Sequence, residues 1–244
     1  MGNLMPTMLT VVLLTHAAAF ALTSEDPPKE PTISEQRERL NSQQTDDLLA
    51  QIGDTLSGLK SLKADFVQQR HMAAFEDALV AKGTMYFQTP GKIRWELREP
   101  YRSALIFDGD SVAKYLLDEP RPRRLKAGSS EVMKEVLRFI ALWIQGDFER
   151  SRRVFDLHVE RECLAPRRGE VDGQVEEVCV FFLVFTPRSS RMTERIRSIE
   201  LALDEDSTHI DRVTIREKSG DHIVIRFANK QPNLKLADQL FALD

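Results

Sequence analysis

Apolar and polar residues alternate with a period of two along most of the chain after its first quarter, and this pattern constrains the fold more than any other feature. The clearest run is residues 92–98, in which Ile93, Trp95 and Leu97 alternate with charged side chains. Such alternation is typical of a strand with one buried and one solvent-exposed face. About nine strands of this kind are expected, separated by turns rich in Gly, Pro and Asp.

Two segments have helical spacing instead. One apolar face is formed by Leu48, Leu49, Ile52, Leu56 and Leu59, and a stronger apolar stripe runs through residues 130–145. Strands outnumber helices and do not alternate with them, which favours an antiparallel sheet over βαβ units. A sheet of this size curls strongly, so the predicted fold class is mainly β (α+β): a curved, unclosed half-barrel whose helices form a lid over an apolar cavity.

The first residues of the chain are typical of a segment that is cleaved off during secretion. Residues 8–22 carry no charged side chain apart from a protonated His16 and end in small residues around Ala19 and Ala21, which predicts a secretory signal peptide over residues 1–21. No Lys or Arg precedes this run, so a buried N-terminal helix is the alternative. Residues 22–45 are polar and contain prolines, and we expect a disordered acidic linker there. The folded domain is predicted over residues 46–244.

Composition argues against several functional classes. The chain has 34 Lys and Arg residues and 38 Asp and Glu residues, which gives a net charge of −4. Nucleic-acid binders usually have an excess of basic residues instead. The five histidines lack zinc-site spacing, and no phosphate-binding or nucleophile-elbow motif occurs. Ser57 and Lys60 form an S-x-x-K motif without its companion motifs. We therefore predict that the protein is not an enzyme and has no catalytic residues, cofactor, metal site or nucleic-acid partner.

Cys163 and Cys179 end one predicted strand and begin the next. They could face each other across a hairpin whose loop is residues 165–174. In an oxidising compartment such a pair would form a disulfide, which stabilises a loop of this size by about 3 kcal/mol in the chain-entropy model. Two buried free thiols are the alternative.

Aromatic residues are frequent on the stripes expected to point inward. In an incompletely closed barrel such side chains can leave a dry apolar cavity suited to acyl chains, worth about 0.8 kcal/mol per buried methylene. An ordinary packed core is the alternative, because periodicity does not distinguish a lined cavity from a filled one. The aromatic residues concerned are Phe66, Phe87, Trp95, Phe107, Trp143 and Phe182.

Several motifs occur in an order that resembles the periplasmic outer-membrane lipoprotein carrier family (LolA-type). The resemblance extends from about residue 46 to residue 244, and the combined spacing of the P-G-x-x-R-W and D-G motifs is its most specific part. The matching motifs are F-x-Q at Phe66 and Gln68, a glycine-led strand at residues 83–87, P-G-x-x-R-W at residues 90–95, D-G at Asp108 and Gly109, and an L-x-P-K-like turn at residues 185–188.

The resemblance implies a soluble periplasmic shuttle, expected to be a monomer, that carries the acyl chains of lipoproteins from an inner-membrane exporter to an outer-membrane acceptor. Arg94 matches the arginine of the hairpin motif and is a candidate latch for the lid, with a solvent-exposed strand arginine as the alternative. The candidate residues that line the cavity are Phe66, Phe87, Ile93, Trp95, Leu97, Phe107, Val136, Leu137 and Ile140.

One position departs from the family pattern. Thr89 stands before the hairpin proline, where well-studied carriers have a basic residue that is thought to hold the lid closed. The chain therefore resembles a divergent member of the family. Two other functions stay open: a periplasmic carrier for another lipid or amphiphile linked to an exporter, and a regulatory module that senses lipids or lipoproteins.

Overall fold

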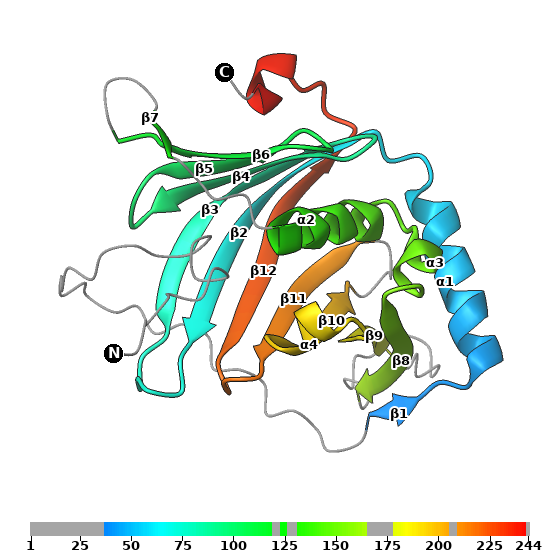
Figure 1. Ribbon diagram of the computed structural model, residues 1–244. Helices are drawn as coiled ribbons and strands as arrows, with labels where there is room; N and C mark the ends of the chain where they lie inside the picture. Colours follow the sequence, from blue (N-terminus) through cyan, green and yellow to red (C-terminus); the bar gives the residue numbers. More distant parts are fainter. Residues whose placement is uncertain (1–36, 119–122, 126–130, 165–177, 205–208, 243–244) are drawn as a thin grey trace, which may run out of the picture.

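The computed structural model describes residues 37–118, 123–125, 131–164, 178–204 and 209–242 (Figure 1). The predicted signal peptide and the predicted hairpin loop at residues 165–174 lie outside these ranges. None of the helices within them is both long and apolar enough to span a membrane.

The strands of the described residues form a single twelve-stranded sheet in which neighbouring strands are antiparallel. The order across the sheet is β1-β8-β9-β10-β11-β12-β2-β3-β4-β5-β6-β7, with β1 and β7 at opposite ends. Figure 1 shows that this open sheet is strongly curved, which confirms the predicted fold class. The strands are β1 (Glu38–Arg39), β2 (Ser61–His71), β3 (Leu79–Gln88), β4 (Lys92–Glu99), β5 (Ser103–Phe107), β6 (Val112–Leu116), β7 (Arg123–Leu125), β8 (Phe155–Leu164), β9 (Val178–Pro187), β10 (Ile196–Leu203), β11 (Ile210–Glu217) and β12 (His222–Pro232).

Few helices accompany the sheet. Helix α2 lies on the concave side of the sheet, and α1 runs beside the edge formed by β8 and β1 (Figure 1). The bounds of α2 agree with the helix predicted at residues 130–145. The helices are α1 (Ser42–Leu56), α2 (Glu131–Ile144), α3 (Phe148–Ser151), α4 (Ser190–Thr193) and the 3-10 helix η2 (Asp238–Phe241).

The two faces of the sheet carry two separate apolar clusters. In β4, Ile93, Trp95 and Leu97 point to the concave face and join the main core, to which α2 contributes Leu137 and Trp143. Alternate residues of β5 and β6 point to the convex face, because successive side chains of a strand point to opposite faces. There they form a second, smaller cluster with η2, made of Ala104, Ile106, Ala113, Tyr115 and Phe241.

The folded domain begins earlier than the sequence predicts. The sequence predicts that the linker extends to residue 45, but β1 pairs with β8 and Asn41 caps α1 through reciprocal hydrogen bonds with Gln44. The guanidinium group of Arg37 lies 3.5 Å from the ring centroid of Phe182. Polar residues that suggested disorder therefore serve as a helix cap and as an edge strand.

Arg37 also corrects the expected direction of Phe182. In the register of β9 and β10, Phe182 lies opposite Ala202, one residue out of phase with the core residues Leu183 and Leu201. Its ring therefore lies on the convex face, where Arg37 covers it and forms an ion pair of 3.0 Å with Glu200. Phe182 is buried, but not in the interior that the sequence pattern suggested.

Candidate apolar ligand site

Helix α2 is anchored to the β8–β9 side of the sheet by aromatic packing. The Trp143 ring lies 4.7 Å from that of Phe185, and Phe139 makes an edge-to-face contact with Phe155 at 4.8 Å. The indole Nε1 of Trp143 donates a hydrogen bond of 2.9 Å to Ser151 Oγ, so its one polar atom is satisfied although the side chain is buried. Such buried aromatic contacts are expected to hold this side of α2 firmly.

Contacts on the other side of α2 are weaker. Gln145 Nε2, just beyond the helix, donates a hydrogen bond of 3.4 Å to the carbonyl of Pro90 in the β3–β4 turn. Arg138 forms an ion pair of 3.5 Å with Asp110 in the β5–β6 turn, and both side chains are largely exposed. Exposed ion pairs contribute little to stability. Helix α2 is therefore attached to the hairpin turns by contacts that can break at low cost.

A small apolar cavity of about 40 Å³ lies between the C-terminal half of α2 and the concave face. Sites for drug-sized ligands have volumes of about 300–1,000 Å³, so an acyl chain does not fit while α2 stays in this position. The cavity is lined by Leu56, Leu59, Leu62, Ala64, Met85, Ile140, Trp143, Ile144, Leu201, His209, Ile210, Val213, Phe227 and Lys230.

The residues that the sequence predicted as lining belong to the same core, but Ile140 is the one among them that contacts the cavity. Val136 packs against this core, and the others are buried within it: Phe66, Phe87, Ile93, Trp95, Leu97, Phe107 and Leu137. The part of the cavity wall formed by β10, β11 and β12 was missed. Alternation in those strands shows which residues are buried, but not which of them face a void. The ligand-binding role of the nine residues stays a prediction.

One packed group on the concave wall consists of Gly83, Phe66 and Trp95. A Cβ atom on Gly83 would clash with the Glu96 carbonyl oxygen and lie 2.5 Å from the Phe66 ring, so this position leaves no room for a side chain. Phe66 in turn packs against Trp95, with ring centroids 4.1 Å apart. The indole Nε1 of Trp95 is buried and has no hydrogen-bond acceptor among the described residues. Trp95 thus brings an unsatisfied donor to an apolar wall.

Lys114 is a buried cation on this wall. It lies on β6 opposite Leu105, a residue of the main core, and it is 8% exposed. Burial lowers the pKa of Lys114, because the charged ammonium loses hydration in this position. The concave face is therefore not uniformly apolar.

Arg94 does not lie where a latch for the lid is needed. It precedes Trp95 in β4 and therefore points to the convex face, away from α2. Its guanidinium group forms an ion pair of 2.7 Å with Glu96 and donates a hydrogen bond of 3.3 Å to the carbonyl of Leu240 in η2. In this structure Arg94 fastens the C-terminal 3-10 helix to the sheet.

Thr89, at the position of the expected basic residue, also makes its own contacts. Its backbone N–H and its hydroxyl group donate hydrogen bonds of 3.0 Å and 3.2 Å to the carbonyl of Lys60. These bonds tie the β3–β4 turn to the segment between α1 and β2. Thr89 therefore positions the turn that α2 contacts.

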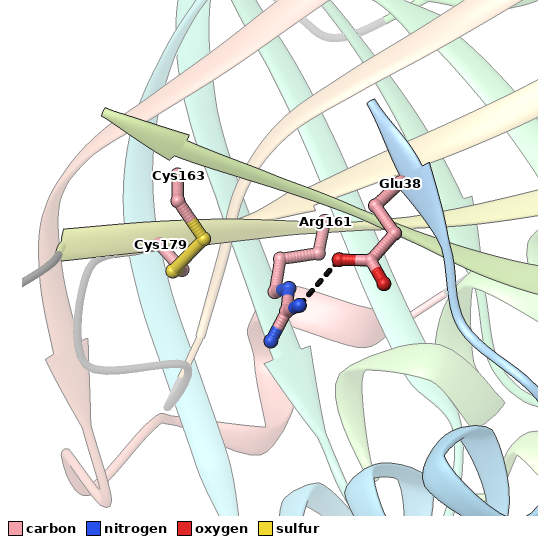
Figure 2. The surroundings of a disulfide bond; sticks show 4 residues. All are labelled: Glu38, Arg161, Cys163 and Cys179. Carbon is pink, nitrogen blue, oxygen red and sulfur yellow. Dashed lines mark hydrogen bonds and ion pairs between the residues drawn. A yellow bond between two sulfur atoms is a disulfide. The ribbon is translucent and has the colours of Figure 1, made fainter. Parts of the chain in front are cut away.

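The structure joins Cys163 and Cys179 in a disulfide, at directly opposed positions of β8 and β9. Figure 2 shows the disulfide and, nearby on β8, the ion pair that Arg161 forms with Glu38 of β1. The disulfide and the ion pair both connect neighbouring strands at the edge of the sheet to which α1 is attached. In the described ranges, no group of three or more His, Cys, Asp or Glu side chains is placed to hold a metal ion.

Comparisons with known proteins agree with the sequence motifs. Residues 57–130 match the family model described as "Outer membrane lipoprotein carrier protein LolA". An outer-membrane lipoprotein carrier protein of Chromohalobacter salexigens is 38% identical over 60 residues, which make up 25% of this chain and 29% of that protein. A protein of the same description from Methylococcus capsulatus is 35% identical over 63 residues, 26% of this chain and 30% of that protein.

The chain thus spans less than a third of the length of these two relatives. Among solved structures, a LolA superfamily protein from Nitrosomonas europaea aligns with 81% of this chain and 97% of its own, at 11% identity and a TM-score of 0.38. The match to the family model includes the β3–β4 hairpin and confirms the resemblance predicted from the motifs.

Proposed function

We propose that this divergent relative of the LolA-type lipoprotein carriers binds acyl chains between α2 and the concave face of its sheet. The observation that carries the proposal is the apolar cavity beneath α2, which Met85, Ile140 and Phe227 help to line. Each methylene group transferred from water into such a site contributes about 0.8 kcal/mol. Binding of this kind needs no catalysis.

Entry of an acyl chain requires α2 to move. The contacts described above favour a pivot about the buried rings of Phe139 and Trp143, while the weaker contacts to the hairpin turns break. The movement uncovers apolar wall that α2 covered, and the acyl chain then replaces the helix as its cover. The free-energy difference between the closed and filled forms stays small, which suits a carrier that must also release its ligand.

In the cell, the proposed cargo is the lipid anchor of lipoproteins, carried from an inner-membrane exporter to an outer-membrane acceptor. The proposal includes a periplasmic location, reached through the signal peptide predicted at residues 1–21. The LolA family match and the relatives described as outer-membrane lipoprotein carrier proteins support this assignment. The predicted monomer is consistent with a soluble shuttle.

A disulfide between α2 and the β3–β4 turn tests whether α2 must move. A Cβ atom on Gly91 would lie 3.8 Å from the Cβ of Ala141, which matches the mean Cβ–Cβ separation of about 3.8 Å in disulfides. In the oxidised Gly91→Cys/Ala141→Cys variant we expect binding of a fluorescent acyl probe to be lost. Reduction of the new bond should restore it, because α2 is then free to leave the turn.

The two single-cysteine variants and the wild-type protein, treated with the same oxidant and reductant, are the matched controls. Peptide mapping establishes that residues 91 and 141 are joined and that Cys163 and Cys179 keep their own bond. Unchanged probe affinity in the locked protein would show that acyl chains bind elsewhere, and the proposed site would then be wrong.

A further inference from the structure

A single row of side chains crosses the concave face from the cavity to the buried lysine. Ala64, Met85, Trp95, Leu105 and Lys114 are consecutive register partners on β2, β3, β4, β5 and β6. Directly opposed residues of neighbouring antiparallel strands share a face, so all five lie on the same surface. Ala64 and Met85 line the apolar cavity. Lys114 stands at the other end of the row.

The spacing of this row is suited to an extended amphiphile. Neighbouring strands are about 4.8 Å apart, so three strand spacings place Lys114 roughly 14 Å from Met85 along the surface. Between them, Trp95 presents the buried Nε1 donor that lacks an acceptor among the described residues. Buried donors of this kind are rare and call for an explanation. A ligand with an oxygen acceptor near its head group would satisfy this donor.

Burial of the Lys114 ammonium group is energetically unfavourable in a wall that contacts only hydrocarbon. Taking an ammonium group out of water costs free energy unless an anion or several acceptors face it. Leu105 of β5 lies directly opposite Lys114, and a leucine would also suit the position of Lys114 if the ligand were purely apolar. Lys114 thus places a buried positive charge on this wall, and that charge can contact the negatively charged end of a ligand.

Arg123 adds a second cation at the outer end of the row. It lies on β7 opposite Leu116, which is two residues after Lys114 and so on the same face, and its side chain is exposed. Both cations interact with other groups of the protein in the closed form. When an anion binds, each cation therefore exchanges a protein partner for the ligand. The reverse exchange allows the ligand to be released.

We propose that the ligand is an anionic acyl amphiphile that lies along this row, with its tail in the cavity and its carboxylate or phosphate at Lys114. This inference rests on the proposed function and specifies the chemical class of its ligand. Trp95 Nε1 donates to an oxygen near the head group, and Arg123 contacts the anion from the edge of the sheet. Neutral acyl compounds occupy the same cavity with lower affinity.

Three twelve-carbon ligands that differ only in their head group test the proposal: dodecanol, laurate and dodecyl phosphate. Their affinities are measured by displacement of an uncharged fluorescent acyl probe from the whole protein. We expect both anions to bind more tightly than dodecanol. Lys114→Met should weaken the anions at least about tenfold, because a charge-assisted contact is lost, and leave dodecanol unchanged. The stronger of the two anions identifies the head group as carboxylate or phosphate.

Lys82→Met is the matched control. Lys82 lies on β3 with an exposed side chain that is ion-paired with Glu99, and it points to the convex face, so its removal should affect none of the three ligands. Trp95→Phe keeps the aromatic ring and removes the donor, and it should weaken all three about threefold. Arg123→Gln alters an exposed side chain and should weaken only the anions, which keeps the test decisive if Lys114→Met does not fold.

The outcomes separate this inference from the proposed function. If the wild-type protein binds none of the three ligands, the acyl-binding function itself is wrong. If it binds all three equally and neither Lys114→Met nor Arg123→Gln discriminates among them, the ligand class is wrong while the cavity keeps its function.

Discussion

Asp65 connects four strands through its carboxylate group. Asn229 of β12 donates a hydrogen bond of 3.0 Å, Thr84 of β3 donates one of 2.9 Å, and Arg98 of β4 contributes an ion pair of 3.0 Å. Asn229 reaches this position with a backbone φ of 52°, in the left-handed region that asparagine tolerates better than most residues. The hydrogen bond from Asn229 is the largest cause that lowers the pKa of Asp65, and Thr84 and Arg98 act in the same direction.

We expect Asp65→Asn to reduce the free energy of unfolding at neutral pH by about 1 kcal/mol or less, since the group is partly exposed. A lowered folded pKa gives stability that is present above the ordinary value of 3.8 and is lost as the pH falls through the folded pKa. The difference between wild type and variant should therefore be full at pH 7 and vanish in strong acid. Urea unfolding at several pH values measures it.

Asp77→Asn is the control for this comparison, because Asp77 is exposed in the β2–β3 turn. It should leave stability unchanged at every pH. A difference between wild type and Asp65→Asn that stays constant down to pH 2 would mean that the carboxylate charge is not what stabilises the four strands.

At the scale of elements, helices and long strands were predictable and short ones were not. The stripe of α2 and the alternation of β4 extend over enough residues to reveal their period, whereas β1 has two residues and β7 has three. Alternation also predicts that Arg94 and Trp95 point to opposite faces, so the location of Arg94 could have been inferred. The small size of the cavity could not, because periodicity does not define how closely α2 packs on the sheet.

The 3-10 helix η2 covers the convex apolar cluster mainly through one residue. Phe241 is 3% exposed and packs with Ala104, Ile106 and Tyr115. We expect Phe241→Ala to cost about 3 kcal/mol, the lower end of the range for buried Phe-to-Ala changes, because η2 can detach instead of leaving a rigid void. Urea unfolding measures the loss, and hydrogen exchange should show reduced protection centred on η2.

Leu234→Ala is a suitable control, since Leu234 is 42% exposed and its truncation should have little effect. Binding of the acyl probe should persist in Phe241→Ala, because the cavity lies on the other face of the sheet. Loss of probe binding in this variant would indicate that the two faces are energetically coupled.

At the scale of the whole molecule, the β8 edge is held by a covalent bond and the β7 edge is not. Cys163 and Cys179 close a loop with a sequence separation of 16 residues. The sequence predicted this pairing from the positions of two strands, since the cysteines fall at their adjoining ends. The disulfide therefore links covalently the two strands next to β1, the strand that precedes α1 along the chain.

We expect the Cys163→Ser/Cys179→Ser variant to lose about 3 kcal/mol of stability, the chain-entropy value for a loop of this length. Urea unfolding of the variant and of the wild-type protein with and without reductant gives the comparison. The reduced wild-type protein should match the variant, and titration of free thiols verifies reduction. Equal stability of the oxidised and reduced proteins would contradict a stabilising role for this bond.

The order of strands has a consequence for how the molecule is made. Strand β12, which follows the other described strands along the chain, lies between β11 and β2 in the middle of the sheet. Until residues 222–232 are available, the earlier strands can assemble only as two separate pieces with an unfilled seam between them. Pairings so distant along the chain form slowly. Pairing of β12 with both β11 and β2 is therefore the step that joins the two pieces into one continuous sheet.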